Sequence, residues 1–205
     1  AGVGASGSGV APSVTYDYSY GTPGWHWDKS DWREDPTGSG GGHSFGEFRG
    51  YSSVTTTVGT GSVKTVSIDY FYRGMNGNPN SSGTPQTVTM TRGWTPGTGG
   101  DGAPGAVYDE DWLAGQVWES YQLDYGTLSY LSASRTYATW TSTATGVNPR
   151  YSLMSAGTIR KWRTTLQHSR LRDGTAASPV WRDSRVDNSW DGYGRQTSTT
   201  STGLL

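Results

Sequence analysis

Polar and apolar side chains alternate most regularly between Val63 and Gly77. Side chains two positions apart share one face of a β-strand, and here one face carries Lys64, Val66, Ile68, Tyr70 and Tyr72. Because β-branched and aromatic residues occupy the opposite face as well, we expect this strand to lie inside a sheet rather than at its edge. The glycines and the Asn-Gly pair within 73–77 predict a sharp reversal at its end.

Shorter alternating stretches are separated by turn signals about every 8–15 residues. They predict strands over 14–20, 52–58, 86–92, 116–123, 127–133, 136–143, 158–172 and 180–189, of which 158–172 fits either one strand or two. The segment 86–92 is expected to return beside the strand that begins at Val63. The one predicted helical turn is 109–114, since its acidic residues suit a helix N-terminus and Gly115 would end it.

No segment sustains the 3.6-residue spacing of an amphipathic helix, so the sequence predicts an all-β protein of antiparallel hairpins. A chain of 205 residues is expected to form one domain. We divide it into a flexible glycine-rich lead, 1–13, and a β-hairpin array, 14–205. Hydrophobic residues make up only 32 % of the chain, below the usual roughly 45–50 %. The 10 tryptophans and 13 tyrosines are therefore expected to supply much of the core.

Composition also narrows the classes of partner. The formal net charge of −1 gives no basic field for nucleic acid. No apolar run reaches the roughly 18 residues that span a bilayer. The chain has no cysteine, so neither a disulfide nor a thiolate metal site can form, and no cofactor is predicted. It begins at Ala1 without a methionine or an apolar signal segment, which favours a processed protein or a piece of a longer one.

Two patterns resemble parts of hydrolase active sites. Gly42-His43-Ser44-Phe45-Gly46 has the spacing of a nucleophile elbow, but a glycine-rich loop precedes it and no helix is predicted after it. Glu47 and Glu119 are the glutamates near predicted strands, and glycosidases use two facing carboxylates. We expect both glutamates to be surface charges or partners of arginines, and predict no catalytic residue.

Metal binding is not predicted either. Asp187, Ser189 and Asp191 imitate the start of a calcium loop, but Ser198 stands where that loop needs a glutamate. No ligand spacing connects the histidines, which are His26, His43 and His168.

Glycan binding is a separate alternative. Trp25, Trp27 and Trp32 are candidates for a platform, because exposed aromatic faces suit sugar rings. Packing between layers of sheet is the other role that we consider for these tryptophans.

Six motifs follow one another along residues 16–195. They are Tyr16-Asp17-Tyr18, Pro23-Gly24-Trp25-His26-Trp27-Asp28, Phe45-Gly46-Glu47-Phe48-Arg49-Gly50-Tyr51, Tyr72-Arg73-Gly74-Met75-Asn76-Gly77, Asp111-Trp112-Leu113-Ala114-Gly115 and Trp190-Asp191-Gly192-Tyr193-Gly194-Arg195. As an ordered set they resemble the motifs of RHS/YD-repeat proteins, in particular the large exported proteins of actinobacteria. The last motif resembles the YD repeat itself, with tryptophan in place of tyrosine.

The resemblance implies both a fold and a role. It implies β-hairpins stacked side by side in an extended, curved sheet, which forms the wall of a hollow shell around a C-terminal toxin or effector. This chain is too short to close a shell. It would be one structural, non-catalytic section of wall, secreted or at the bacterial cell surface. Its partners would be the rest of a larger shell chain, or identical chains that pair through open sheet edges. A carbohydrate-binding β module and a jelly-roll glycoside hydrolase are the alternative functions.

The YD-like motif also has a physical interpretation. Trp190 would pack on the adjacent hairpin, and Asp191 would accept hydrogen bonds from amides of the turn. Gly194 would permit the backbone conformation of the turn. Arg195 would pair with an acidic neighbour.

Overall fold

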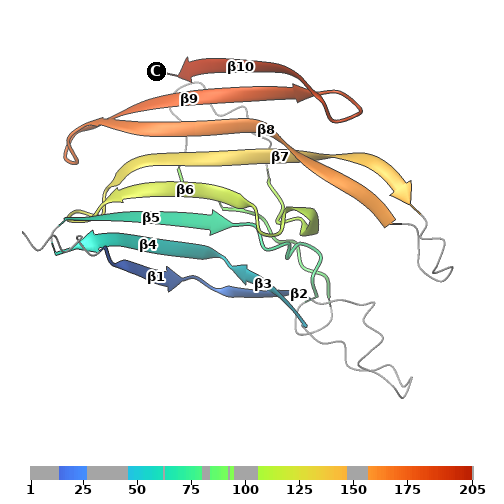
Figure 1. Cartoon of the computed structure of the whole chain (residues 1–205), viewed down its shortest axis with the longest axis horizontal. Helices are drawn as coiled ribbons and strands as arrows, with labels where there is room; N and C mark the ends of the chain where they lie inside the picture. Colours follow the sequence, from blue (N-terminus) through green and yellow to red (C-terminus); the bar gives the residue numbers. More distant parts are fainter. Residues whose placement is uncertain are drawn as a thin grey trace, which may run out of the picture.

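The protein is an open antiparallel β-sheet (Figure 1). The computed structural model describes residues 14–26, 46–61, 63–79, 84–91, 93–94, 106–146 and 157–204. The order of the eight strands across the sheet is β1-β4-β5-β6-β7-β8-β9-β10. Their bounds are β1 Tyr16–Tyr20, β4 Ser53–Thr60, β5 Val63–Phe71, β6 Val117–Asp124, β7 Tyr130–Gly146, β8 Gly157–Gly174, β9 Pro179–Trp190 and β10 Gln196–Leu204. A separate two-stranded ribbon pairs β2 (Pro23–His26) with β3 (Glu47–Tyr51). The predicted all-β, antiparallel fold is confirmed. The predicted lead, 1–13, lies outside the described residues.

The strand that begins at Val63 lies inside the sheet, as its two-faced pattern predicted. β5 pairs with β4 on one side and β6 on the other. Gly59 and Gly61 make the turn between β4 and β5 with φ angles of +124° and +59°, which side chains rarely adopt. The predicted helical turn is also present, as a 3₁₀ turn, η2, over Asp111–Leu113.

The prediction for 86–92 was wrong, because β6, and not this segment, lies beside β5. Its backbone bonds to other loops instead. The amide of Val88 donates to the side chain of Asn76 at 3.1 Å, and that of Met90 donates to the carbonyl of Val107 at 2.7 Å. The alternation in this segment therefore marks packing against the core and not membership of the sheet.

The two longest strands form a ribbon that projects beyond the sheet. The predicted strands 127–133 and 136–143 belong to one strand, β7, which begins only at Tyr130, and 158–172 falls within one strand, β8. β7 pairs with β6 only as far as Arg135, and β8 pairs with β9 only from Leu166 onward. Beyond those residues the described parts of β7 and β8 pair with each other alone, down to Gly146 and Gly157 (Figure 1).

The core lies on one face of the middle strands, where the loops 72–79, 84–91, 93–94 and 106–116 pack; we call these loops the cover. Tyrosine and tryptophan supply much of it, as the composition predicted. One cluster contains Tyr72, Leu113, Trp118, Tyr137 and Leu166, with Met90 and Val107 packed against it. A second cluster contains Val66, Tyr121, Leu123 and Ala133, with Ile68 and Trp94 packed against it.

A β-bulge explains how β6 buries two consecutive side chains. β6 has one extra residue opposite Tyr70 and Phe71, and such an insertion breaks the alternation of faces. Trp118 and Glu119 are accordingly 1 % and 2 % exposed. The indole of Trp118 donates to the carbonyl of Thr91 at 3.1 Å, and the carboxylate of Glu119 accepts from the amide of Gly93 at 3.0 Å. Thr91 and Gly93 are thereby held on this face.

Candidate functional site

Ionisable side chains cross the covered face in a row, which we call the charged row. Glu119, Arg135, His168 and Arg185 lie directly opposite one another on β6, β7, β8 and β9. The first three are at most 2 % exposed. Charges buried as deeply as those of Glu119 and Arg135 are tolerated only when they are paired and hydrogen-bonded.

Glu119 is the centre of the buried network. Its carboxylate accepts hydrogen bonds from the guanidinium of Arg135, the hydroxyl of Tyr121 and the amide of Gly93. Both carboxylate oxygens are therefore already engaged by the protein.

Arg135 connects the sheet to its cover. Its guanidinium donates to the carbonyl of Trp94 at 2.6 Å and to the hydroxyl of Tyr137 at 3.2 Å. It also lies 4.8 Å from the ring of Trp94 and 5.4 Å from that of Trp118, in cation–π geometry. Burial alone would lower the pKa of Arg135, but the charge of Glu119 and the hydrogen bonds raise it overall.

A second ion pair lies in the neighbouring row of the same face, where Arg170 of β8 is opposite Asp183 of β9. Arg170 binds both carboxylate oxygens of Asp183, at 2.7 and 2.9 Å. Its guanidinium is 4.7 Å from the ring of Trp94 and 5.0 Å from that of Trp181. Trp94 therefore contacts two arginines, the buried Arg135 and the partly buried Arg170, which ties the cover to both β7 and β8.

A cavity of about 350 Å³ lies between the cover and strands β5, β6 and β7. Its walls include Tyr70, Tyr121 and Tyr130, and Asp109 and Glu119 also line it. Burial raises the pKa of Tyr121, and the hydrogen bond that it donates to Glu119 raises it further. The pKa of Tyr70 is also raised, first by burial and then by the proximity of Tyr130 and Glu119. Perturbed titrating groups in a cleft favour a functional site.

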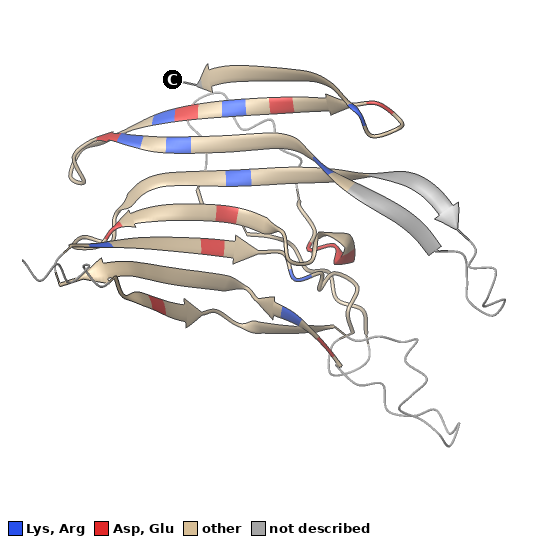
Figure 2. Cartoon of the chain, in the orientation of Figure 1, with Lys and Arg blue, Asp and Glu red and all other residues tan. Residues whose placement is uncertain are grey.

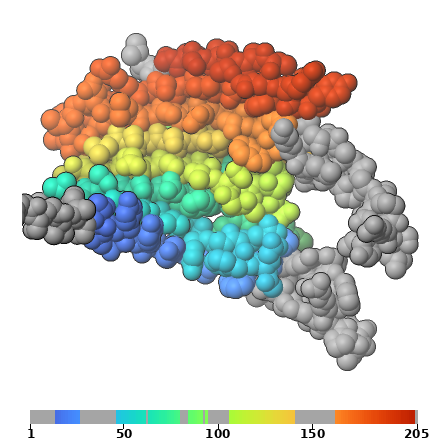
Figure 3. Space-filling view, in the orientation of Figure 1, coloured from blue at the N-terminus to red at the C-terminus, as the bar shows by residue number. Residues whose placement is uncertain are grey.

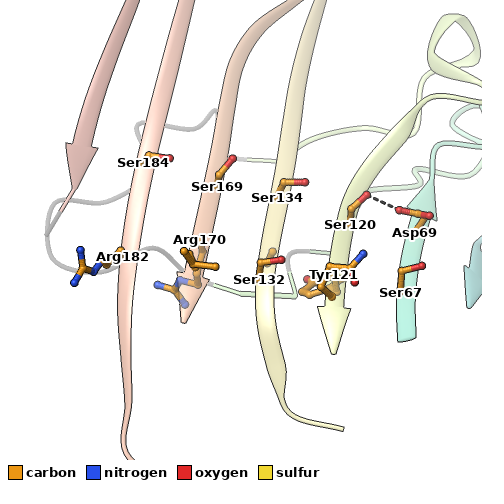
Figure 4. A pocket seen from close by; sticks show the side chains of 13 residues that line it. Ser67, Asp69, Ser120, Tyr121, Ser132, Ser134, Ser169, Arg170, Arg182 and Ser184 are labelled. Carbon is orange, nitrogen blue, oxygen red and sulfur yellow. Dashed lines mark hydrogen bonds between the residues drawn. The ribbon is translucent and has the colours of Figure 1, made fainter. Parts of the chain in front are cut away.

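The opposite face of the sheet carries small polar side chains. Asp69, Ser120, Ser134, Ser169 and Ser184 form one row across five strands. Figure 4 shows the serines side by side, with the hydroxyl of Ser120 bonded to Asp69. They line a shallow hollow of about 480 Å³ that also includes Gln122 and Arg182.

The motif Tyr72 to Gly77 lies at a junction of loops. The buried carboxylate of Asp109 accepts the amides of Arg73 and Gly74 through one oxygen, Oδ1, both at 2.8 Å. Gly74 has a φ of +71°, and a Cβ there would lie 2.9 Å from the Cα of Asp111. The ring of Tyr72 packs edge-on against Trp118. The amide of Gly77 donates to the carbonyl of Gln86 at 2.8 Å. This motif therefore positions the cover.

The motif that ends in Arg49, Gly50 and Tyr51 fastens the small ribbon. Arg49 pairs with Asp111 at 2.7 Å and with Glu47 at 2.9 Å. Gly50 has a φ of +84°. The ring of Tyr51 packs on that of Tyr20, with centroids 4.7 Å apart.

The YD-like motif forms the turn between β9 and β10. The carboxylate of Asp191 accepts the amides of Tyr193 and Arg195 at 2.9 and 2.8 Å, and pairs with the guanidinium of Arg195 at 2.7 Å. Gly194 has a φ of +75°. The indole of Trp190 donates to the carbonyl of Thr164 in β8 at 2.9 Å. These are the hydrogen bonds and the packing that the sequence predicted for the turn, although Arg195 pairs with the acid of its own motif.

The other candidates either lie partly outside the described residues or are held apart in the structure. Trp25 is 45 % exposed and packs on Phe48. Its proposed companions Trp27 and Trp32, like His43 and Ser44, lie outside the described residues. The two candidate glutamates occupy separate clusters, Glu47 beside Arg49 and Glu119 beside Arg135.

The described carboxylates of the calcium-like pattern bind arginines. Asp187 pairs with Arg185, and Asp191 pairs with Arg195. Within the described ranges, no three histidine, aspartate or glutamate residues lie close enough to hold a metal ion. None of the helices described there is long and apolar enough to cross a membrane.

Sequence reasoning missed the cavity and the charged row. Asp109 was assigned to a helix N-terminus, and Arg135 fell in the supposed gap between two strands. The available signal was Glu119, which the sequence predicts to be a surface charge or a partner of arginines; it is buried and pairs with Arg135.

Comparison with known proteins yields no relative. No family model matches the chain, and neither a curated protein nor a solved structure matches it.

Proposed function

We propose that this chain is a structural section of an extended β-sheet wall, which continues by strand pairing at its edges. One observation carries the proposal: among the described strands, β1 pairs only with β4, and β10 pairs only with β9. The two edges lie at opposite borders of the molecule (Figure 3). An edge strand offers unpaired N–H and C=O groups that template another strand. The resemblance to RHS/YD-repeat proteins supports the same role.

The composition of β10 supports pairing at that edge. Its sequence, Gln-Thr-Ser-Thr-Thr-Ser-Thr-Gly-Leu, has no charge and no proline. Figure 2 shows it without the charged residues that mark β9 beside it. Natural sheets protect free edges with charges, prolines or bulges. The register of β10 shifts only between Gln196 and Ser198 and is regular from there on.

The ion pairs Glu119–Arg135 and Asp183–Arg170 support a structural role for this face of the sheet. The oxygens of Glu119 and Asp183 bind arginines, and their partners come from neighbouring strands. Such pairs fix strand register, because a slip of one residue would bury unpaired charges.

Analytical ultracentrifugation of the full chain tests the proposal. Thr200→Pro and Ser201→Pro form a matched pair, because alternate amides of an edge strand point toward its neighbour and away from it. We expect reversible association of the native chain. The proline that replaces an amide pointing away from β9 should abolish association without lowering stability. The proline that replaces an amide pointing toward β9 should lower stability, because it breaks the β9–β10 ladder. A chain that stays monomeric, and that binds no synthetic peptide copying β1 or β10, would contradict edge pairing.

A further inference from the structure

The cavity under the cover has the features of a small-molecule site. Its volume of about 350 Å³ lies within the roughly 300–1,000 Å³ range of ligand pockets. Tyr70 and Tyr130 are 39 % and 46 % exposed, whereas Tyr121 between them is 4 % exposed. The ring of Tyr121 lies 5.8 Å from that of Tyr70 and 5.0 Å from that of Tyr130. The cavity therefore has accessible aromatic rings at its mouth and a buried one deeper inside.

A buried carboxylate in its wall has spare hydrogen-bonding capacity. Asp109 is 1 % exposed and lines the cavity. Its Oδ1 accepts two backbone amides, from Arg73 and Gly74. Among the described residues no hydrogen bond reaches its Oδ2, and this oxygen is not among the fully buried atoms that lack a partner, so it is open to the cavity. Water or a ligand hydroxyl in the cavity can therefore donate to it.

The charges around the cavity favour a neutral ligand over a cationic one. The negative charge of Glu119 is already balanced by Arg135, which is fully buried. Asp109 and Arg73 also line the cavity. The guanidinium of Arg73 donates to the carbonyls of Thr22 and Pro23 at 3.3 and 3.4 Å. The two carboxylates are thus matched by two arginines, which leaves no net negative charge to select an organic cation. A ligand that donates from uncharged hydroxyl groups satisfies a carboxylate, which only accepts, without adding a charge.

We propose that this cavity binds a single neutral sugar ring. The apolar C–H face of the ring would stack on Tyr130 or Tyr70, and a sugar hydroxyl would donate to Oδ2 of Asp109. Hydroxyls of Ser52, Thr89 and Thr91, which also line the cavity, supply further donors and acceptors. The residues differ from the tryptophan platform considered in the sequence, and the site does not depend on edge pairing.

Isothermal titration calorimetry of the full chain with methyl glycosides of glucose, galactose, mannose, xylose and N-acetylglucosamine tests the site. We expect saturable binding of at least one glycoside, with a Kd on the order of 1 mM, which is ordinary for a small ligand with few contacts. Asp109→Asn keeps the Oδ1 acceptor and replaces Oδ2 by a donor, so it should abolish binding. Tyr130→Ala should weaken binding about tenfold, the equivalent of one aromatic contact.

Controls separate the site from general effects. Tyr193→Ala removes a tyrosine that is 81 % exposed on the β9–β10 turn, and it should leave binding unchanged. Circular dichroism establishes that each variant is folded. If Asp109→Asn unfolds, Tyr130→Ala decides, because its half-exposed ring can be removed with less disturbance. The proposal is overturned if no glycoside binds, if Tyr130→Ala binds as tightly as the native chain, or if tetramethylammonium binds in preference to every glycoside.

Discussion

Removing Arg135 should be one of the most destabilising single changes in this protein. In Arg135→Met, the carboxylate of Glu119 would stay buried, with only the hydroxyl of Tyr121 and the amide of Gly93 for compensation. Breaking a buried ion pair on one side costs about 3–5 kcal/mol. The remaining hydrogen bonds to Glu119 favour the lower end, near 3 kcal/mol. The carbonyl of Trp94 also loses its donor, which adds about 1 kcal/mol.

We therefore expect a loss of about 4 kcal/mol in the free energy of unfolding. With a urea m-value of about 2 kcal/mol/M, the unfolding midpoint falls by about 2 M. Tryptophan fluorescence during urea unfolding measures it. The double variant Glu119→Gln/Arg135→Met removes the unpaired charge, so it should be more stable than the sum of the single changes predicts, by at least about 1 kcal/mol.

A matched control uses an exposed ion pair. Arg182 and Asp173 are 71 % and 52 % exposed, so solvent and salt screen their attraction. Arg182→Met should leave the urea midpoint nearly unchanged. The reasoning would be refuted if Arg135→Met cost less than about 1 kcal/mol, or if the double variant lost the full sum of the two single changes.

Three further changes test other parts of the structure. Gly74→Ala combines a φ of +71° with a close backbone contact, so it should lower the free energy of unfolding by about 2 kcal/mol or more. Gly77→Ala has a φ of +88° but no atom near its Cβ, so it should lower the free energy of unfolding by less in the same urea assay. Trp118→Ala should cost about 3–5 kcal/mol in thermal unfolding, because the side chain is 1 % exposed in the core; a loss under about 1 kcal/mol would contradict the packing. The amide and guanidinium of Arg195 hold the pKa of Asp191 below its ordinary value, so Asp191 stabilises the fold above its unfolded pKa and loses that contribution as pH falls through the folded pKa. Asp191→Asn should therefore flatten the decline of stability between about pH 4 and pH 2, and an unchanged pH profile would contradict this role.

The sequence predicted those elements whose signal is local. β5 is predicted to lie inside the sheet because both of its faces carry strand-forming residues. The aromatic core followed from a composition in which few aliphatic residues are available. In each case neighbouring residues carry the information.

Features that depend on distant partners could not be predicted. The sequence predicts two strands, 127–133 and 136–143, with Arg135 between them, whereas the structure has the single strand β7 through this residue. Its partners are Trp94, Glu119 and Tyr137, of which the first lies 41 positions away in the chain. The alternation in 86–92 similarly arises from packing on the core, while its amides bond to other loops. Periodicity shows which side chains are buried, but it does not show which group satisfies a buried charge or amide.

The projecting β7–β8 ribbon implies that the backbone amides at the two ends of β7 exchange with solvent at different rates. Near Arg135, β7 is paired on both sides, so its amides should exchange with deuterium only through large openings of the sheet. In the projecting part, β7 after Arg135 and β8 before Leu166 pair only with each other. Isolated two-stranded hairpins are marginally stable in water. Deuterium uptake should therefore rise along β7 from Tyr137 to Gly146, and the ribbon should fray from its tip while its base stays closed.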